Sequence, residues 1–196
     1  PKLKHLLNKE FKDPYGVFKE FLAVIKGSLA SATGGAGYLS RTEYAEGGAR
    51  AGNAHRDSSV TSTATKHSVY IAFEKYLSLQ RQRHEWDCCT LAHDLIKRLK
   101  RSGYEGRPVT TLMSDESQDL LVLQMVPFSF VCTSLEAFTI AADTAQVIAH
   151  GREFKFAALK DAWYDHFVKL ESPSGFHTSS SQKVRDIFSL THNYRS

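Results

Sequence analysis

Three stretches of the chain carry apolar residues at helical spacing. In the first, over residues 9–27, the apolar stripe consists of Phe11, Val17, Phe18, Phe21, Leu22 and Ile25. Asp13 followed by Pro14 is typical of a helix start, and Gly27 is typical of a stop. This pattern predicts an amphipathic helix that packs on a core or forms an insertion covering one.

The second and third helical stretches are predicted over residues 66–82 and 87–101. The apolar positions of the second are Val69, Phe73, Tyr76 and Leu77. In the third, the predicted apolar face is Leu91, Leu95, Ile96 and Leu99, and the predicted polar side is His93, Lys97, Arg98, Lys100 and Arg101. The basic cluster indicates either a solvated helix end or a contact with a nucleic-acid backbone. Trp86 is expected to pack at the junction of the two helices, with stacking on a base as the alternative.

A segment rich in Gly, Ala, Ser and Thr separates the first two helical stretches. Its run from Gly34 to Gly37 is not a phosphate-binding loop, because Tyr38 follows where such a loop has Lys. Ser40 and Glu43 have the spacing of a helix capping box. Residues 47–65 are expected to form a flexible loop.

Two short apolar runs in the second half of the chain end in acidic residues. The run over 109–114 is followed by Asp115 and Glu116, and the run over 138–142 is followed by Asp143. Buried parallel strands whose carboxyl ends open onto a phosphate site have this pattern. One carboxylate can hold Mg²⁺ and its neighbour can polarise a water molecule, although a solvated acidic turn gives the same local sequence.

The remaining segments are expected to be mainly helical. Residues 120–134 should form a helix disturbed by Pro127, and residues 154–167 should form a hydrophobic helical segment. A Ser/Gly/Pro loop over 172–181 and a further helix over 184–190 should lead to the final residues.

Composition narrows the class of protein. The chain has 196 residues, of which 42% are hydrophobic and 23% are charged, with a formal net charge of +4. These values predict a globular, intracellular protein, nuclear or cytoplasmic, and the mild charge alone does not indicate nucleic acid. Three cysteines without paired metal spacing indicate reduced thiols, and no apolar run is long enough for a membrane span. The chain begins without Met and without a signal peptide, so a fragment of a longer protein is expected.

Three short motifs in order resemble the UvrD/Rep-like group of superfamily 1 helicases, in particular its large eukaryotic members. The family pattern is Asp-Glu-x-Gln-Asp, then Gly-Asp-x-x-Gln, then Asn-Tyr-Arg-Ser. In this chain the corresponding residues are Asp115, Glu116, Gln118 and Asp119, then Asp143 and Gln146, then Asn193, Tyr194, Arg195 and Ser196. Ala142 and Ser114 depart from the family, which usually has Gly and an apolar residue there.

The resemblance implies a role for each matched residue in ATP hydrolysis. It implies that Asp115 binds Mg²⁺, that Glu116 activates water, and that Gln118 and Asp119 link the nucleotide site to neighbouring motifs. Gln146 would sense the γ-phosphate or its attacking water, and Asp143 would support the same region. Arg195 would stabilise charge in the transition state, and Tyr194 would stack near the adenine.

The fold implied is α/β, a partial RecA-like domain with parallel strands and a helical N-terminal part. Residues 1–65 would be a helical insertion with a flexible loop, and residues 66–196 part of the ATP-binding domain. The cofactors implied are ATP and Mg²⁺, and the partner is single-stranded DNA or RNA. A non-catalytic interaction domain descended from a helicase is the alternative, because no phosphate-binding loop is present in the chain.

Overall fold

The first predicted helix forms in two parts. The computed structural model describes residues 7–47, 58, 60, 62–133 and 138–143. Helix α2 (Pro14–Lys19) continues directly into a π-helix, η1 (Glu20–Lys26), and residues 7–10 form a separate helical turn. The predicted start signal at Asp13 and Pro14 is confirmed, while the predicted helical region from about residue 9 is interrupted between residue 10 and Pro14. Asp13 caps α2 by accepting a 2.9 Å hydrogen bond from the Gly16 N–H, and Gly27 ends η1 with φ −91°, without a left-handed residue.

Two short helices follow. They are α3 (Leu29–Thr33) and α4 (Arg41–Ala45). The predicted capping box of α4 is confirmed: the Ser40 N–H donates to Glu43 Oε2 over 2.7 Å, and the Glu43 N–H donates to Ser40 Oγ over 3.3 Å. The predicted loop over 47–65 lies largely outside the described residues, and its last three residues include the start of the next helix.

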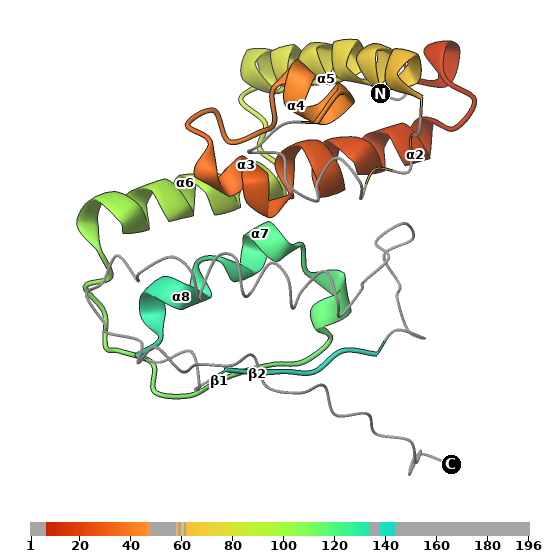
Figure 1. Cartoon of the computed structure of the whole chain (residues 1–196). Helices are drawn as coiled ribbons and strands as arrows, with labels where there is room; N and C mark the ends of the chain where they lie inside the picture. The colour runs from red at the N-terminus through yellow and green to blue at the C-terminus, as the bar shows by residue number, and fades with distance from the viewer. Residues whose placement is uncertain (1–6, 48–57, 59, 61, 134–137, 144–196) are drawn as a thin grey trace.

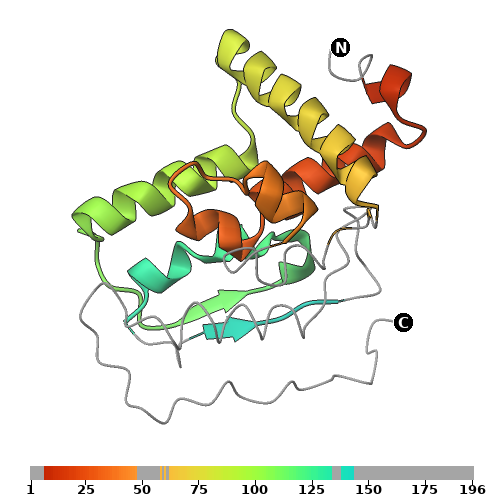
Figure 2. The ribbon, with the colours of Figure 1, turned by 45° about the horizontal axis from the view of Figure 1, so that its top comes forward.

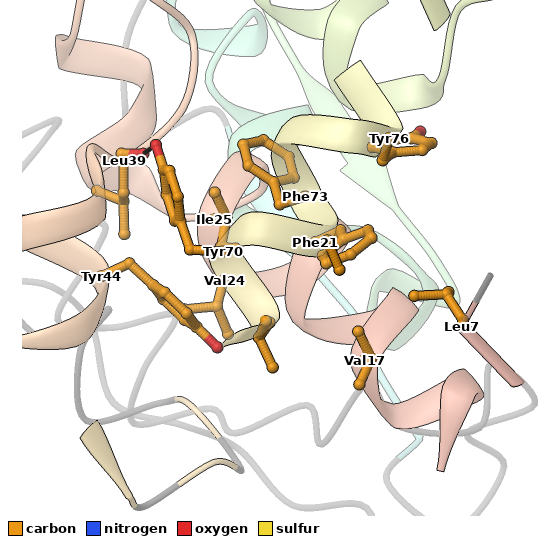
Figure 3. Packing of buried hydrophobic residues seen from close by; sticks show 12 residues of the cluster. Leu7, Val17, Phe21, Val24, Ile25, Leu39, Tyr44, Tyr70, Phe73 and Tyr76 are labelled. Atoms are coloured by element: carbon orange, nitrogen blue, oxygen red, sulfur yellow. Dashed lines mark hydrogen bonds between the residues drawn. The ribbon is translucent and has the colours of Figure 1, made fainter. Parts of the chain in front are cut away.

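Helix α5 (Thr63–Arg83) forms a core with the N-terminal helices. Its residues Val69, Phe73 and Tyr76 are buried as predicted, and Leu77 packs against the same cluster. Figure 3 shows side chains of η1 and α5 meeting in this core. Phe21 of η1 lies against Phe73 and Tyr76 of α5, with ring centroids 5.5 Å apart in both pairs. The Tyr70 hydroxyl donates a 2.8 Å hydrogen bond to the Leu39 carbonyl. This core is continuous across the predicted domain boundary at residue 65, and the division into two domains stays a prediction.

Helix α6 (Cys88–Ser102) begins and ends where the sequence predicts, but its faces differ. Leu91 and Leu95 are exposed, so their assignment to the apolar face is wrong. His93 is buried, so its assignment to the polar side is wrong too. The buried positions are Cys89, Ala92, His93, Ile96 and Leu99. Asp87 and His93 both make hydrogen bonds within the protein, and these bonds offset the free-energy cost of removing their polar groups from water.

Trp86 precedes α6 and is 70% exposed. The expectation that it packs at the junction between α5 and α6 is therefore wrong. The junction is filled instead by polar contacts of Asp87 with Tyr76 and Gln80 of α5. These contacts leave the indole on the surface.

The two predicted strands form a parallel pair, as expected. Strand β1 (Leu112–Ser114) pairs with β2 (Phe138–Ile140), with Ser114 opposite Ile140. An isolated parallel bridge joins Val109 to Cys132 at the other end. The predicted run over 109–114 is thus a regular strand only in its last three residues. Met113 is 77% exposed, so the expectation that β1 is buried on both faces is wrong.

A broken helical segment connects the strands, as Pro127 predicts. It consists of the 3₁₀ turn η3 (Ser117–Asp119), α7 (Val122–Met125) and α8 (Phe128–Val131). Figures 1 and 2 show α7 between the sheet and the helices α3 and α6. A second core fills this layer, and it consists of Ala32, Cys89, Ala92, Ile96, Leu121, Leu123 and Val126. The described chain therefore has an α/β architecture, with a helical layer over a small parallel sheet.

The segment after η3 is joined directly to the end of η1. The Leu123 N–H donates a 3.3 Å hydrogen bond to the Gly27 carbonyl. A Cβ atom added at Gly27 would lie 2.9 Å from Cδ1 of Leu121. The acidic turn is thus attached to the N-terminal helical layer through α7. Among the described helices, none has the length and apolar character needed to cross a bilayer.

Candidate functional site

The acidic turn at the carboxyl end of β1 brings two strand ends together. The Ala141 N–H donates to the Ser114 carbonyl over 2.8 Å, and the Ser117 N–H donates to the Ala141 carbonyl over 3.0 Å. Between these bonds, Glu116 adopts a left-handed conformation with φ 51° and ψ 34°. A residue other than Gly rarely adopts this backbone conformation, so the surrounding hydrogen bonds must hold Glu116 in it.

Two serine hydroxyls stabilise this turn from inside. Ser117 is fully buried, and its hydroxyl donates to the Ser114 carbonyl over 3.1 Å. The hydroxyls of Ser114 and Ser117 are themselves 2.7 Å apart. Ser114, which departs from the family pattern, therefore has a hydrogen-bonded role at the strand end.

Gln118 connects the acidic turn to the residue after β2. Its side-chain Nε2 donates to Oε2 of Glu116, and its Oε1 accepts a 3.0 Å hydrogen bond from the backbone N–H of Asp143. Gln118 is 1% exposed. The structure thus brings together Glu116, Gln118 and Asp143, which the sequence separates by up to 27 positions (143 − 116).

The three acidic side chains at this end differ from the buried Gln118 in being open to solvent. Asp115, Glu116 and Asp143 are all exposed. Oδ1 of Asp115 accepts a 2.9 Å hydrogen bond from the Glu116 N–H. Asp119 turns inward: its N–H donates to the Glu116 carbonyl over 3.0 Å, and its Oδ1 is buried. The residue as a whole is partly exposed.

An exposed carboxylate of this kind fits one type of metal site. No group of three or more His, Cys, Asp or Glu residues in the described parts of the chain could hold a metal ion by itself. Mg²⁺ in nucleotide sites needs only one or two carboxylates, because phosphates and water supply its other ligands. Asp115 fits that requirement, and the acidic turn does not fit a metal site built from protein ligands alone.

The other residues implied by the family resemblance fall beyond this region. Gln146, Asn193, Tyr194, Arg195 and Ser196 lie outside the described residues, as do the expected helices over 154–167 and 184–190. Of the second motif, the structure describes Ala142 and Asp143. The roles of Gln146, Tyr194 and Arg195 stay predictions.

A buried ion pair that the sequence analysis missed lies at the junction of η1, α5 and α6. Lys26 Nζ lies 2.5 Å from Asp87 Oδ2, and it donates to Thr90 Oγ1 over 2.7 Å. Asp87 Oδ2 also accepts from the Tyr76 hydroxyl over 2.5 Å and from Gln80 Nε2 over 2.9 Å. Burial raises the pKa of Asp87, but the hydrogen bonds from Lys26, Tyr76 and the Thr90 N–H outweigh it and lower the pKa to about 2. The cap position of Asp87 could be inferred from its place before a predicted helix, but its pairing with Lys26 could not.

A second buried polar group lies at the beginning of η1. Glu20 Oε2 accepts hydrogen bonds from the Tyr44 hydroxyl over 2.9 Å and from Ser58 Oγ over 2.8 Å. Burial and the adjacent Glu20 raise the pKa of Tyr44. Burial lowers the pKa of Lys66, and the negative charge of Glu20 partly offsets this decrease. The two hydrogen bonds hold α4 and Ser58 to the π-helix.

A third buried polar group is centred on His93. Its Nε2 lies 3.0 Å from the Lys26 carbonyl and 3.3 Å from Ser31 Oγ. Gly37 packs against the same imidazole, since a Cβ there would lie 3.2 Å from the ring. Gly37 of this turn therefore packs against α6. Cys88, Cys89 and Cys132 are free thiols.

Comparison of the chain with protein-family models, with curated protein sequences and with solved structures finds no match. The helicase resemblance therefore rests on the three short motifs in the sequence.

Proposed function

We propose that this chain is a segment of an ATP-dependent superfamily 1 helicase or translocase of the UvrD-like group. One observation carries the proposal. Asp115, Glu116 and Asp143 follow the same ends of two adjacent parallel strands, and Gln118 hydrogen-bonds both Glu116 and Asp143. Catalytic groups of RecA-like motors lie at this end of a parallel sheet.

In this proposal the two adjacent carboxylates have different tasks. Asp115 holds Mg²⁺ bound to the phosphates of ATP, since its carboxylate is exposed and Mg²⁺ takes few protein ligands. Glu116 accepts a proton from the attacking water, a role that needs a carboxylate open to the nucleotide. The strained backbone of Glu116 supports this assignment, because left-handed residues are concentrated at functional sites.

Groups outside the described residues complete the site in this proposal. Gln146 senses the γ-phosphate, Arg195 stabilises the charge that develops during phosphoryl transfer, and Tyr194 stacks near the adenine. The proposal also requires a phosphate-binding loop, which residues 1–196 do not contain. Hydrolysis is then coupled to movement along single-stranded DNA or RNA.

ATP turnover of the full-length protein tests the proposal. We expect turnover that is stimulated by single-stranded nucleic acid, and a Gly-Lys-Thr or Gly-Lys-Ser loop in the coding sequence before Pro1. The 196-residue chain is the control and should release little or no phosphate, because it lacks the lysine that binds the β- and γ-phosphates. Absence of turnover by the full-length protein, or robust turnover by the chain alone, would contradict the proposal.

The alternative is a non-catalytic interaction domain derived from a helicase. The exposed apolar residues Leu91 and Leu95, one turn apart on α6, favour it, because neighbouring exposed apolar side chains often mark binding surfaces. A full-length protein that neither binds nor hydrolyses ATP would support this second function.

A further inference from the structure

We propose that Gln118 is a positioning residue that makes the orientation of the Glu116 carboxylate depend on the backbone at Asp143. Its catalytic consequence rests on the proposed function, but the coupling itself does not. The sequence resemblance implied a general link between motifs and grouped Gln118 with the cofactor-binding residues. The structure specifies this link, because the buried carboxamide is hydrogen-bonded to Glu116 on one side and to Asp143 on the other.

The hydrogen bonds determine which way the carboxamide points. The backbone N–H of Asp143 can only donate, so the atom 3.0 Å from it must be the carbonyl oxygen Oε1. The amide nitrogen Nε2 then faces Oε2 of Glu116, and an ionised carboxylate can only accept. The reversed orientation would place two donors together and two acceptors together. Gln118 therefore has one orientation that satisfies both neighbours.

Burial makes this orientation rigid. Gln118 is 1% exposed, so water cannot readily replace either partner. Glu116 is exposed, and an exposed glutamate ordinarily samples several rotamers. The bond from Gln118 fixes one carboxylate oxygen of Glu116, and the other remains available to a water molecule. A shift of the Asp143 amide would turn the carboxamide and release the carboxylate.

The chain supplies the structural elements that such coupling needs. Glu116, Gln118 and Asp143 are joined to one another, and the Ser117 N–H holds the turn to Ala141 beside them. The position of the strand end after β2 is thus transmitted to Glu116 through one side chain. In the proposed motor, the segment that begins at Asp143 is the γ-phosphate sensor, so sensing would control when Glu116 is aligned.

Nuclear magnetic resonance on the 196-residue chain tests the coupling without any activity. Glu116→Gln removes the charge that Gln118 contacts, so it should shift the signals of the Gln118 side-chain amide and of the Asp143 backbone amide. Glu74→Gln, which changes an exposed glutamate of α5 paired with Arg41, is the matched control and should leave both signals in place. Unchanged Gln118 and Asp143 signals in Glu116→Gln, or equal shifts in the two variants, would overturn the coupling.

Two substitutions distinguish the hydrogen bond that Gln118 makes to Asp143 from the one it makes to Glu116. Gln118→Leu removes both, and the exchange of the Asp143 amide hydrogen should accelerate about tenfold or more. Gln118→Glu keeps an acceptor for that amide, so its exchange should stay within about threefold of wild type. Gln124→Glu, which adds a carboxylate to α7 where Gln124 accepts from the Leu121 N–H, is the matched control. Equal acceleration in all three variants would overturn the assignment.

The functional consequence is measured in the full-length protein. Both Gln118→Leu and Gln118→Glu should lower kcat about tenfold or more and leave ATP affinity within about threefold, because each removes the donor to Glu116. Gln124→Glu should retain wild-type turnover. If wild type lacks ATPase activity, the proposed function fails while the resonance data still decide the coupling. If wild type is active and the Gln118 variants match it, the positioning role fails alone.

Discussion

The ammonium of Lys26 lies 2.5 Å from the carboxylate of Asp87, 61 positions later in the chain, at the point where η1 ends and α6 begins. The two side chains are 4% and 11% exposed. Tyr76 and Gln80 extend the contact to α5. One ion pair therefore fixes the relative positions of three helices.

Replacing Lys26 should be strongly destabilising. Lys26→Met keeps the aliphatic stem but leaves Asp87 buried without its counter-ion, so the free energy of unfolding should fall by about 3–5 kcal/mol. Urea denaturation measures the loss. Adding Asp87→Asn should cost less than the sum of the two single changes, because the pair acts as a unit. Arg98→Ala, which breaks the exposed pair with Asp94, is the control and should cost no more than about 0.5 kcal/mol. Equal losses for Lys26→Met and Arg98→Ala would contradict the assignment.

Acid should remove the contribution of Asp87. Its pKa is about 2 in the folded chain against an ordinary 3.8, so the unfolded chain binds more protons between these values. Stability from this group is complete above about pH 4 and is lost as pH falls toward 2, by about 2 kcal/mol. Comparing the pH dependence of unfolding in wild type and Asp87→Asn measures it. Identical acid profiles would rule out the effect.

The burial of His93 should also lower stability in acid, but this effect should begin at a higher pH than that of Asp87. Burial is the main cause that lowers its pKa below the ordinary 6.5, outweighing the bond to the Lys26 carbonyl. The folded chain therefore binds fewer protons than the unfolded chain as pH falls below about 6.5, and stability declines from there. His93→Asn should flatten the slope of unfolding free energy just below pH 6.5. Gln82→Ala, at an exposed position of α5 that does not titrate, is the control and should leave the slope unchanged.

Gly27 should tolerate no side chain. A Cβ there would lie 2.2 Å from the Leu22 carbonyl and 2.9 Å from Leu121 Cδ1, so backbone must move. Gly27→Ala should lower the melting temperature and cost roughly 2 kcal/mol or more, within the range of overpacked sites. A Cβ at Gly35 meets nothing within 4 Å, so Gly35→Ala is the matched control and should cost no more than about 0.5 kcal/mol. Equal melting temperatures for the two variants would contradict this packing.

Helix ends were predictable because their chemistry is local. Asp13, Ser40 with Glu43, and Asp87 each bond an N–H three positions along the chain. The parallel pairing was also predictable, since two short apolar runs ended in acidic residues. Pro127 predicted the interruption between α7 and α8 for the same local reason.

The orientation of α6 and the environment of Trp86 were not predictable from local pattern. Leu91 and Leu95 fit an apolar stripe, but distant partners decide which side of α6 is buried. Lys26 bonds Asp87 and Thr90, and its carbonyl receives His93. At the candidate site the acids were identified, but the orientation of Gln118 toward two neighbours 27 positions apart (143 − 116) required the fold.

Separating the tasks of Glu116 and Asp115 tests the proposed motor most directly. Glu116→Gln keeps an acceptor for Gln118 and removes the proton-accepting charge. In the full-length protein, ATP affinity should therefore survive while turnover falls roughly a hundredfold or more. Asp115→Asn should weaken Mg²⁺-dependent ATP binding as well as turnover. The decisive measurement is ATP affinity and turnover of both variants beside wild type. Normal turnover by Glu116→Gln would contradict the helicase proposal, because Glu116 would then be only part of an acidic surface turn.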